Sequence, residues 1–370
     1  MVLRVLVVGQ TPPPYHGQSI AIERLLASQF PRVRLFHVRM RFSATIDEVG
    51  KPSMGKVPRM LSLVARIIAA RVRHRTSVLY YPPAGPKLVP MYRDAAVLIA
   101  TRWLFSRTVF HFHAGGLTER LGSMAWPERV LFRLAYFRPD MAIRVAEETP
   151  PDGERLGALQ ERVVPYGIED VFSAFESLRT VARSKPVILF VGMLSEGKGI
   201  LPMLDACAQL RARGVPFHLR LVGAFASAEI ETSVRQTLEM RGLGDDVCIA
   251  GVATGDAKWR EYAGADVFCY PSSYDAEGLP IAVLEAMQFQ LPVVATRWRG
   301  LRSEVREGET GFLVEPNDPE ALADRLQRCL GDPELRRRMG ARAREVFCAE
   351  YTIERWRERM EEALLAAASK

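Results

Sequence analysis

Short apolar runs alternate with amphipathic segments along the whole chain, and this alternation predicts strands and helices in turn. In the first half, runs with the length and composition of buried strands occur at residues 4–8, 33–38, 78–81, 108–113 and 141–144. The segments between them predict helices at residues 19–27, 58–73, 92–105 and 127–137. A last short strand is expected at residues 163–168.

The same alternation resumes after a polar, aperiodic stretch, residues 169–186, which is typical of a linker. Further strands are predicted at residues 187–192, 217–222, 247–250, 267–269, 292–295 and 311–314. Helices are predicted at residues 199–213, 228–240, 279–288, 319–330 and 352–368. The pattern indicates an α/β protein with parallel-sheet domains at residues 1–168 and 187–350, and such sheets bind ligands at the carboxyl ends of their strands.

Composition narrows the class of protein. A chain of 370 residues with 48% hydrophobic and 25% charged residues is ordinary for a soluble protein of two domains. Its five cysteines include no Cys-x-x-Cys pair, so neither a disulfide framework nor a zinc site is indicated and we expect a cytoplasmic setting. Met1 leads directly into a strand-like run, and no apolar stretch reaches the length of a membrane span, so we expect neither signal peptide nor anchor.

Charge is distributed unevenly. Residues 1–139 hold 21 Lys and Arg against 6 Asp and Glu, whereas residues 140–370 hold 29 against 37. A basic first half indicates an anionic partner there, such as a membrane surface, a phosphorylated substrate or nucleic acid. That half has no aromatic-interleaved RNA motif and no recognised DNA-reading unit, so we do not expect nucleic acid.

Glu277 and Glu285 enclose the sequence Gly-Leu-Pro-Ile-Ala-Val-Leu directly after a predicted strand and turn. Gly278 and Pro280 favour a tight turn and a helix that begins near Leu279. Glu277 then lies just ahead of a helix N-terminus, where backbone N–H groups can receive an anion. Two solvated acids at a helix end are the alternative interpretation of this spacing.

Two further loops have the composition of phosphate-binding turns. Residues 192–199 carry Gly192 and Lys198 at the entrance of a helix, although the spacing is neither a P-loop nor a dinucleotide fingerprint. The first loop, residues 9–19, is stiffened by prolines and places Gly17 at a helix start. Ordinary surface turns are the alternative for both loops.

His111 and His113 flank Phe112 at the end of a predicted strand, so their side chains share one face of the sheet. A metal site is not indicated, because no carboxylate or cysteine cluster completes it. We interpret His113, next to Gly115 and Gly116, as a substrate contact and His111 as a buried core histidine.

The second half resembles family 4 of the retaining, nucleotide-sugar-dependent glycosyltransferases, also described as glycosyl transferases group 1. The matching stretches are residues 192–199, 277–285, 300–304 and 308–322, in the order and spacing of that family. The first half matches more loosely, through Gly17, residues 113–116 and residues 164–168. The resemblance implies the GT-B fold, in which two Rossmann-like domains face each other across a cleft and a C-terminal helix, here residues 351–370, crosses back to the first domain.

The resemblance also implies roles for single residues. Glu277 matches the glutamate that contacts the transferring sugar, Glu285 the one that hydrogen-bonds the nucleotide ribose, and Lys198 the lysine that neutralises the diphosphate. Gly17 matches a glycine that faces the phosphates, and His113 a histidine near the donor sugar. Lys198, Glu277 and His113 are therefore the expected catalytic residues.

Backbone groups complete the expected donor site. Gly192, Gly278 and Leu279 would lie against the diphosphate, whereas Pro280 has no N–H to contribute. The chain departs from the family at Met193, where an arginine is usual. We hypothesise that the missing charge comes from Arg297, Arg299 or Arg302 in a neighbouring loop.

The implied reaction needs no metal ion and no cofactor, because cations and helix N-termini stabilise the charge on the departing phosphate. The expected partners are a nucleotide-sugar donor, a glycan or lipid-linked acceptor, and an anionic membrane surface contacted by the basic amphipathic segment 58–75 on the inner face of the cell membrane. A core-packing helix is the alternative for that segment.

Two alternative functions remain. One is a sugar-nucleotide 2-epimerase on the same scaffold, and the other is a non-catalytic protein that binds anions.

Overall fold

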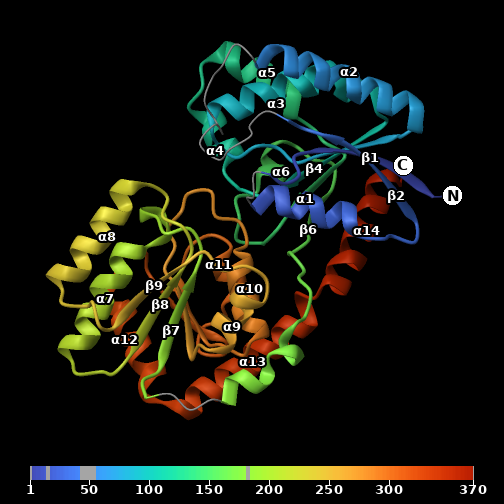
Figure 1. Ribbon diagram of the computed structural model, residues 1–370. Helices are drawn as coiled ribbons and strands as arrows, with labels where there is room; N and C mark the ends of the chain where they lie inside the picture. Colours follow the sequence, from blue (N-terminus) through green and yellow to red (C-terminus); the bar gives the residue numbers. More distant parts are fainter. Residues whose placement is uncertain (1, 14–16, 42–55, 181–183, 370) are drawn as a thin grey trace. The chain divides into compact units, whose positions relative to one another are not determined.

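The computed structural model describes residues 2–13, 17–41, 56–180 and 184–369 (Figure 1). The chain divides into two compact units. Unit 1 comprises Met1–Tyr166 and Trp356–Lys370, and unit 2 comprises Gly167–Arg355. Unit 1 therefore contains the beginning and the end of the chain, as the expected return of the C-terminal helix requires.

Unit 1 is built on a parallel sheet with the strand order β2-β1-β3-β4-β5-β6. The strands are β1 (Leu3–Gly9), β2 (Val33–Arg39), β3 (Val78–Tyr81), β4 (Arg107–Phe112), β5 (Met141–Arg144) and β6 (Glu161–Val163). The first five confirm the predicted strands to within one residue at each end. Their buried Val, Leu, Ile and aromatic side chains are those expected of strands covered on both faces.

The last predicted strand of the first half, residues 163–168, is wrong. β6 ends at Val163, and after Val164 donates to Arg144 the chain leaves the sheet. Ile168 instead pairs with Thr352 in unit 2, where its N–H donates to the Tyr351 carbonyl. The apolar run spans the boundary between the two units. Its residues are apolar because they are buried in two different units, not because they form one strand.

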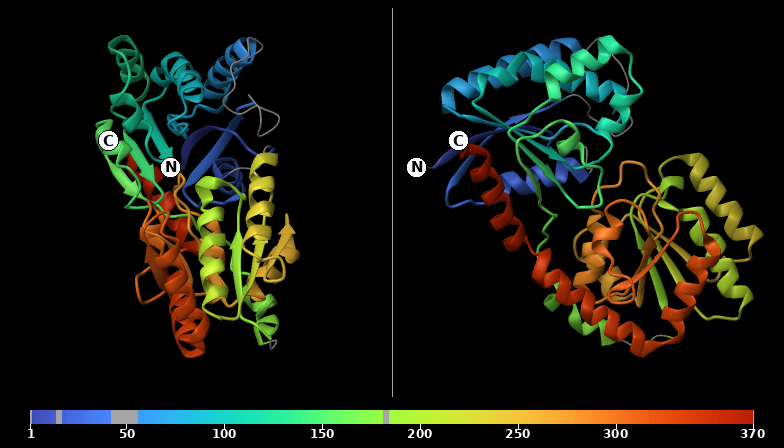
Figure 2. Two further views of the ribbon diagram at one scale, coloured as in Figure 1. Left: turned by 90° about the vertical axis from the view of Figure 1, so that its left-hand side faces the viewer. Right: turned by 180° about the vertical axis from the view of Figure 1, so that it is seen from behind.

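Helices cover both faces of this sheet (Figures 1 and 2). On one face lie α2 (Lys56–His74), α3 (Leu88–Thr101) and α5 (Trp126–Tyr136). On the other lie α1 (Gly17–Ala27) and α14 (Ile353–Ala368), and α14 is anchored by a 2.6 Å bond from the Arg32 amide to Glu361. Two short helices, α4 (Leu117–Gly122) and α6 (Asp152–Arg155), have no counterpart in the sequence prediction.

Unit 2 has a second parallel sheet with the order β12-β11-β10-β7-β8-β9. Its strands are β7 (Val187–Val191), β8 (His218–Val222), β9 (Val247–Gly251), β10 (Val267–Tyr270), β11 (Val293–Thr296) and β12 (Gly311–Val314). The chain builds outward from β7 to β9, then returns to the other side of β7 with β10. The junction of β7 and β10 is therefore the topological switch point, where open α/β sheets bind ligands.

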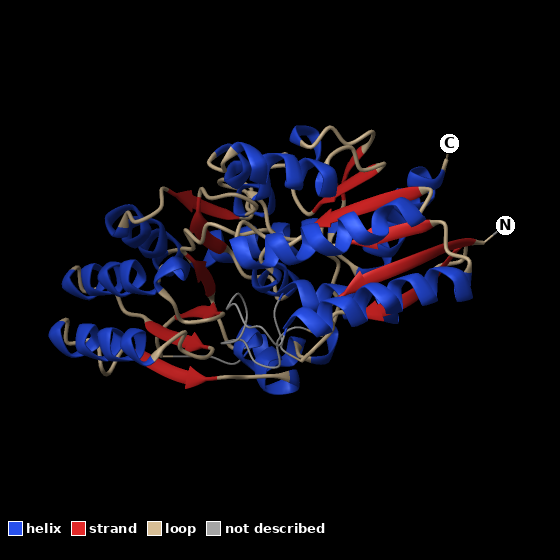
Figure 3. Cartoon of the chain, turned by 90° about the horizontal axis from the view of Figure 1, so that it is seen from above, coloured by secondary structure: helices blue, strands red, loops and turns tan. Residues whose placement is uncertain are grey.

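The helices of unit 2 flank these strands (Figure 3). They are α7 (Ile200–Ala212), α8 (Ala228–Met240), α9 (Gly255–Ala263), α10 (Ile281–Gln288), α11 (Leu301–Glu304), α12 (Pro319–Gly331) and α13 (Pro333–Glu350). The prediction omitted α9, α11 and α13. α10 begins at Ile281 rather than near Leu279, because Pro280 is extended and occupies the N-cap position.

Residues 169–180, where we expected a linker, pack into unit 2. They form two short 3₁₀ helices, η3 (Phe172–Ala174) and η4 (Glu176–Thr180). Phe172 and Phe175 are buried, and their rings lie 5.9 and 6.3 Å from that of Phe289. Two isolated aromatic residues among polar ones show no periodicity, so the sequence pattern missed this anchoring.

Among the described residues, no helix combines the length and the apolar character needed to span a bilayer.

Candidate active site

The ion pair between Lys198 and Glu277 lies at the switch point of unit 2. Lys198 ends a 3₁₀ turn, η5 (Glu196–Lys198), after β7, and Glu277 lies in the loop after the adjacent strand β10. The Lys198 Nζ and Glu277 Oε2 atoms are 2.6 Å apart, and Glu277 is only 6% exposed. Strand order thus brings together the two residues that the sequence named as the main site candidates.

Ser272 orients the Glu277 carboxylate. Its hydroxyl lies 2.6 Å from Glu277 Oε2 and 3.3 Å from the Gly197 carbonyl, and it accepts a hydrogen bond from the Tyr274 amide. Because a hydroxyl has one proton to donate, the shorter contact to Glu277 takes it. Glu277 Oε2 therefore receives both a hydroxyl and an ammonium, which fixes the carboxylate in one orientation.

Two tyrosines enclose the Lys198 ammonium. Nζ lies 5.2 Å from the ring centre of Tyr270 and 5.1 Å from that of Tyr274. Burial alone lowers the pKa of Lys198, but Tyr270 and Glu277 outweigh it and raise the pKa above the ordinary lysine value. The site therefore holds a permanent cation at neutral pH.

The backbone of the two loops is locked together at Gly197 and Gly199. The Gly197 carbonyl accepts a 2.8 Å hydrogen bond from the Ser273 amide. Gly199 has φ +74°, and a Cβ on it would lie 2.0 Å from the Pro271 carbonyl oxygen. Only glycine fits at this close contact between the two loops. The contact directs the start of α7 toward the site that contains Lys198.

The helix starts at the switch point supply further positive potential. α7 begins at Ile200 and α10 at Ile281, each at the carboxyl end of the strand that precedes it. The first N–H groups of a helix have no partner within it and carry a partial positive charge, so they attract anions. Gly278 and Leu279, the expected phosphate contacts, are buried just ahead of α10, and Gly192 directly follows β7.

Glu285 lies inside α10 and forms a second buried polar cluster. Lys258 Nζ is 2.6 Å from its Oε1 atom, and the Tyr262 hydroxyl donates to its Oε2 atom at 2.8 Å. Lys258 and Tyr262 both belong to α9, a helix that the sequence analysis missed. Glu285 is thus a paired, oriented carboxylate and not a solvated helix-end acid.

The three arginines considered as replacements for a cation at Met193 have different surroundings. Arg297 pairs with Glu315 at 3.2 Å and with Glu307 at 3.9 Å, so its charge is already engaged at β12. The Arg299 guanidinium lies over the Trp298 ring, and Arg302 is exposed on α11. Met193 itself is 47% exposed.

Glu304 is a buried carboxyl that the sequence analysis did not single out. It lies on α11 with 0% exposure, and neither of its oxygens has a hydrogen-bond partner among the described residues. Burial first, and the Glu277 carboxylate second, raise the pKa of Glu304 well above its usual range. Burial and the Glu277 charge therefore both favour the neutral form of Glu304.

The candidate residues of unit 1 lie at the carboxyl ends of its own strands. Gly17 is exposed at the first position of α1. His113 is buried, with Nδ1 2.7 Å from the Tyr166 hydroxyl. His111 is 1% exposed and its Nδ1 lies 2.5 Å from the Tyr80 hydroxyl, which confirms it as a core histidine. The two imidazole rings are 4.0 Å apart, as their shared face of the sheet predicts.

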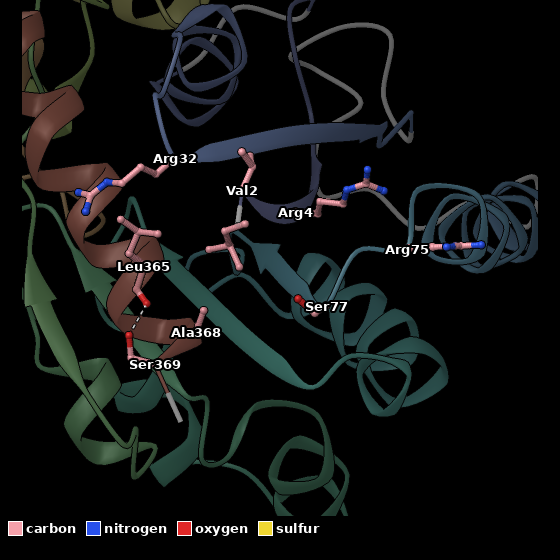
Figure 4. A pocket seen from close by; sticks show the side chains of 9 residues that line it. Val2, Arg4, Arg32, Arg75, Ser77, Leu365, Ala368 and Ser369 are labelled. Atoms are coloured by element: carbon pink, nitrogen blue, oxygen red, sulfur yellow. Dashed lines mark hydrogen bonds between the residues drawn. The ribbon is translucent and has the colours of Figure 1, made fainter.

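A pocket of about 550 Å³ in unit 1 lies at the opposite edge of its sheet (Figure 4). Its lining includes Val2 and Arg4 at the start of β1, Ser77 just before β3, and the end of α14 near Leu365. Arg4 there donates to the His74 carbonyl and Arg32 pairs with Glu361. Parallel sheets bind ligands at carboxyl ends, so this pocket is not the candidate active site.

Sequence comparison identifies relatives of the chain. Residues 175–346 match the family model described as Glycosyl transferases group 1. The putative colanic acid biosynthesis glycosyltransferase WcaL of Escherichia coli is 28% identical over 72% of this chain and 64% of its own length. The sulfoquinovosyl transferase SQD2 of Arabidopsis thaliana is 33% identical over 80% of this chain and 58% of its own. The chain thus spans less than two thirds of the length of these relatives.

Structural comparison shows the fold. Sucrose-phosphate synthase from Thermosynechococcus elongatus superposes with a TM-score of 0.76 at 20% identity, covering 99% of this chain and 100% of its own. HepE from Anabaena, solved in complex with UDP and glucose, gives 0.73 at 20% identity, covering 98% and 99%.

Two parallel six-stranded α/β units with a cationic site at a switch point define a protein of the GT-B class. Within that class, residues 175–346 match the glycosyl transferases group 1 family, and the chain is similar to glycosyltransferases such as WcaL. The expected GT-B fold and the expected similarity to the glycosyl transferases group 1 are therefore confirmed. The sequence analysis missed the supporting residues Ser272, Tyr270, Tyr274, Lys258, Tyr262 and Glu304. Of these, Ser272 and Glu304 stood in segments that it had marked, the turn between β10 and Glu277 and the stretch 300–304.

Proposed function

We propose that the protein is a retaining glycosyltransferase of family 4 that moves a hexosyl unit from a UDP- or GDP-sugar to a glycan or lipid-linked glycan. The observation that carries this proposal is the buried Lys198–Glu277 pair between the starts of α7 and α10. A cation and two helix N-termini suit a diphosphate, and an oriented carboxylate beside them suits sugar hydroxyls.

The relatives support the class of reaction and its setting. WcaL is named for colanic acid biosynthesis, and another relative from Salmonella typhimurium, 29% identical over 57% of this chain and 58% of its own length, is a lipopolysaccharide 1,2-N-acetylglucosaminetransferase. HepE was solved with UDP and glucose. We therefore propose a role in surface polysaccharide or glycolipid synthesis, in the cytoplasm or at the inner face of the cell membrane.

The proposed reaction breaks the bond between the anomeric carbon and the donor diphosphate and forms a bond to an acceptor hydroxyl. Negative charge grows on the β-phosphate as it leaves, and Lys198 with the α7 and α10 amides stabilises it without a metal ion. The departing phosphate oxygen takes the acceptor proton, so the product forms on the face that the diphosphate leaves. Glu277 holds the hexosyl unit in place, and no general acid is needed.

The remaining expected contacts complete the proposal. Glu285, oriented by Lys258 and Tyr262, would accept hydrogen bonds from the ribose. Gly17 and His113 of unit 1 would contribute to donor binding, as the family resemblance implies. No cofactor is proposed.

The test is a panel of UDP- and GDP-hexoses, with thermal stabilisation and slow donor hydrolysis as readouts. We expect one donor to raise the melting temperature of the wild type and of Glu239→Gln, an exposed control in unit 2. Glu277→Ala should keep its fold but lose turnover. Normal turnover by Glu277→Ala, or release of an epimerised sugar without acceptor, would overturn the assignment.

A further inference from the structure

The outer face of α2, α3 and α5 in unit 1 exposes large apolar side chains. Trp103, in the short 3₁₀ helix η2 (Arg102–Leu104) directly after α3, and Trp126 on α5 are each 75% exposed. Val72 on α2 and Leu134 on α5 are 71% and 67% exposed. Further exposed residues on the same helices are Leu61, Ile68, Leu88, Val89, Tyr92, Ile99, Val130 and Leu131. Scattered apolar residues are normal on a protein surface, but a contiguous set marks an interaction site.

Helical spacing places these residues in stripes. On α5, Trp126, Val130 and Leu134 recur every four residues, while Phe132 and Tyr136 face the core. On α2, Leu61, Ile68 and Val72 share one face, while Leu63 and Ile67 are fully buried. Each helix is therefore apolar on its core side and again on its outer side, which packing within unit 1 does not require.

The stripes adjoin because the three helices pack side by side (Figures 1 and 2). α3 contacts α5 through Tyr92 and Phe132, whose ring centres are 5.3 Å apart. α2 contacts η2, just after α3, through Arg71, which donates to the Leu104 carbonyl at 3.0 Å. The exposed apolar residues thus belong to one layer.

The charge of this layer is mostly positive. α2 contains no Asp or Glu, and the only acid of α3, Asp94, is fully buried and bonded to Tyr81 and Ala84. The acid of α5, Glu128, bonds the Tyr92 hydroxyl and the Ala125 amide. Exposed arginines alternate with the apolar residues, at positions 59, 66, 129 and 133.

An arginine-lined pocket of about 510 Å³ lies at the flank of α2. Arg41, Pro58, Arg59, Ser62 and Arg66 line it. Burial, and then the like charge of Arg41, lower the pKa of Arg66. Among the described residues, none of these three arginines forms an ion pair with a carboxylate, so the pocket suits a phosphate group.

We propose that the outer face of α2, α3 and α5 binds an anionic phospholipid bilayer. Exposed tryptophans enter the interface between headgroups and acyl chains, and the arginines neutralise lipid phosphates, with one headgroup in the Arg41–Arg59–Arg66 pocket. Sequence alone indicated this role only for segment 58–75; the structure adds α3 and α5. The inference goes beyond the proposed transfer reaction, because binding to lipid needs neither donor nor acceptor.

Flotation of the full chain with vesicles of pure phosphatidylcholine or of phosphatidylcholine with phosphatidylglycerol tests the proposal. Wild type should float with the anionic vesicles and lose binding as salt rises. The variant Trp103→Ser/Trp126→Ser/Leu134→Ser should bind at least tenfold more weakly, and Arg59→Gln/Arg66→Gln should lose the dependence on anionic lipid. Met240→Ser/Val252→Ser, which changes two exposed apolar residues of unit 2, should bind as wild type does.

Thermal unfolding of each variant separates loss of binding from loss of fold. The proposal is overturned if wild type does not float with anionic vesicles, or if the triple variant retains its fold and wild-type binding. Sedimentation that shows a dimer in wild type and a monomer in the triple variant, without vesicle binding, would instead assign this face to a second copy of the chain. Because donor stabilisation is read separately, either proposal can fail alone.

Discussion

Lys198 Nζ and Glu277 Oε2 lie 2.6 Å apart although 79 positions separate the two residues in the sequence. Each stands in the loop after a strand of the central pair β7 and β10. The lysine is held by the carboxylate and by two tyrosine rings, so its position is set before any anion arrives. This arrangement provides a preorganised cation for a leaving diphosphate.

Removing that cation should slow transfer strongly. Lys198→Ala should reduce the rate by about 100- to 1000-fold, which is typical for loss of one preorganised contact to a developing charge. Because the pKa of Lys198 is raised, its charge persists at every pH below the ordinary lysine value and is lost only under more alkaline conditions. Donor affinity of the wild type should therefore show no lysine titration between about pH 6 and 9. Lys185→Ala, a surface control paired with Asp246, should leave the rate unchanged; equal losses in both variants would contradict the role.

Ser272 should act through the orientation of Glu277. Ser272→Ala removes the 2.6 Å bond to Oε2 and should lower kcat by about tenfold, since a hydrogen bond to a charged group contributes about 1.5–3 kcal/mol. The pair Ser272→Ala and Glu277→Gln should be less than additive in steady-state kinetics. Strict additivity would show that the serine acts independently of the glutamate.

The segment that carries Arg297, Arg299 and Arg302 allows the contributions of three arginines to donor binding to be compared. Arg299→Ala and Arg302→Ala should weaken donor binding by about 1 kcal/mol each if they replace the cation missing at Met193. Arg297→Ala tests the third candidate, which pairs with Glu315. Calorimetric titration with UDP would decide; normal affinity in all three variants refutes the hypothesis.

Alanine substitutions at Gly199 and Gly214 distinguish the cost of backbone strain from the cost of a steric clash. Both have positive φ, +74° and +70°, but a Cβ on Gly199 would meet Pro271 O at 2.0 Å, whereas Gly214 has open space. Gly214→Ala should cost about 1 kcal/mol of unfolding free energy. Gly199→Ala should cost more and also reduce donor binding, because the loops around Lys198 must separate. Denaturant unfolding and donor titration measure the two effects, and equal costs for both variants would show that the Pro271 contact is easily relieved.

His111 should make unit 1 sensitive to acid. Burial, and then His113, lower the pKa of His111 well below its ordinary value, so the folded protein keeps it neutral beside Tyr80. At pH above about 6.5 both folded and unfolded states carry a neutral imidazole, and there is no penalty. As the pH falls further, only the unfolded state binds the proton, and unfolding free energy drops by up to about 1.4 kcal/mol per pH unit. His111→Asn should flatten this slope in urea unfolding, and an unchanged slope in that variant would contradict the role of His111.

Local patterns in the sequence determined most of the secondary structure and the main site candidates. Strands β3, β5 and β12 and helix α8 have the predicted bounds, because periodicity and turn residues report burial directly. Lys198 and Glu277 stood out because each lies just ahead of a helix start after an apolar strand, and Glu285 because it lies near the start of the second of these helices.

Only the tertiary structure decided which side chains meet. The parallel pairing of β7 with β10 brings Lys198 to Glu277, and α9 supplies Lys258 and Tyr262 to Glu285. The same packing turned residues 169–180 from an expected linker into an anchor on Phe289, and engaged Arg297 with Glu315. These outcomes depend on strand order and long-range contacts, which a local pattern of polar and apolar residues does not encode.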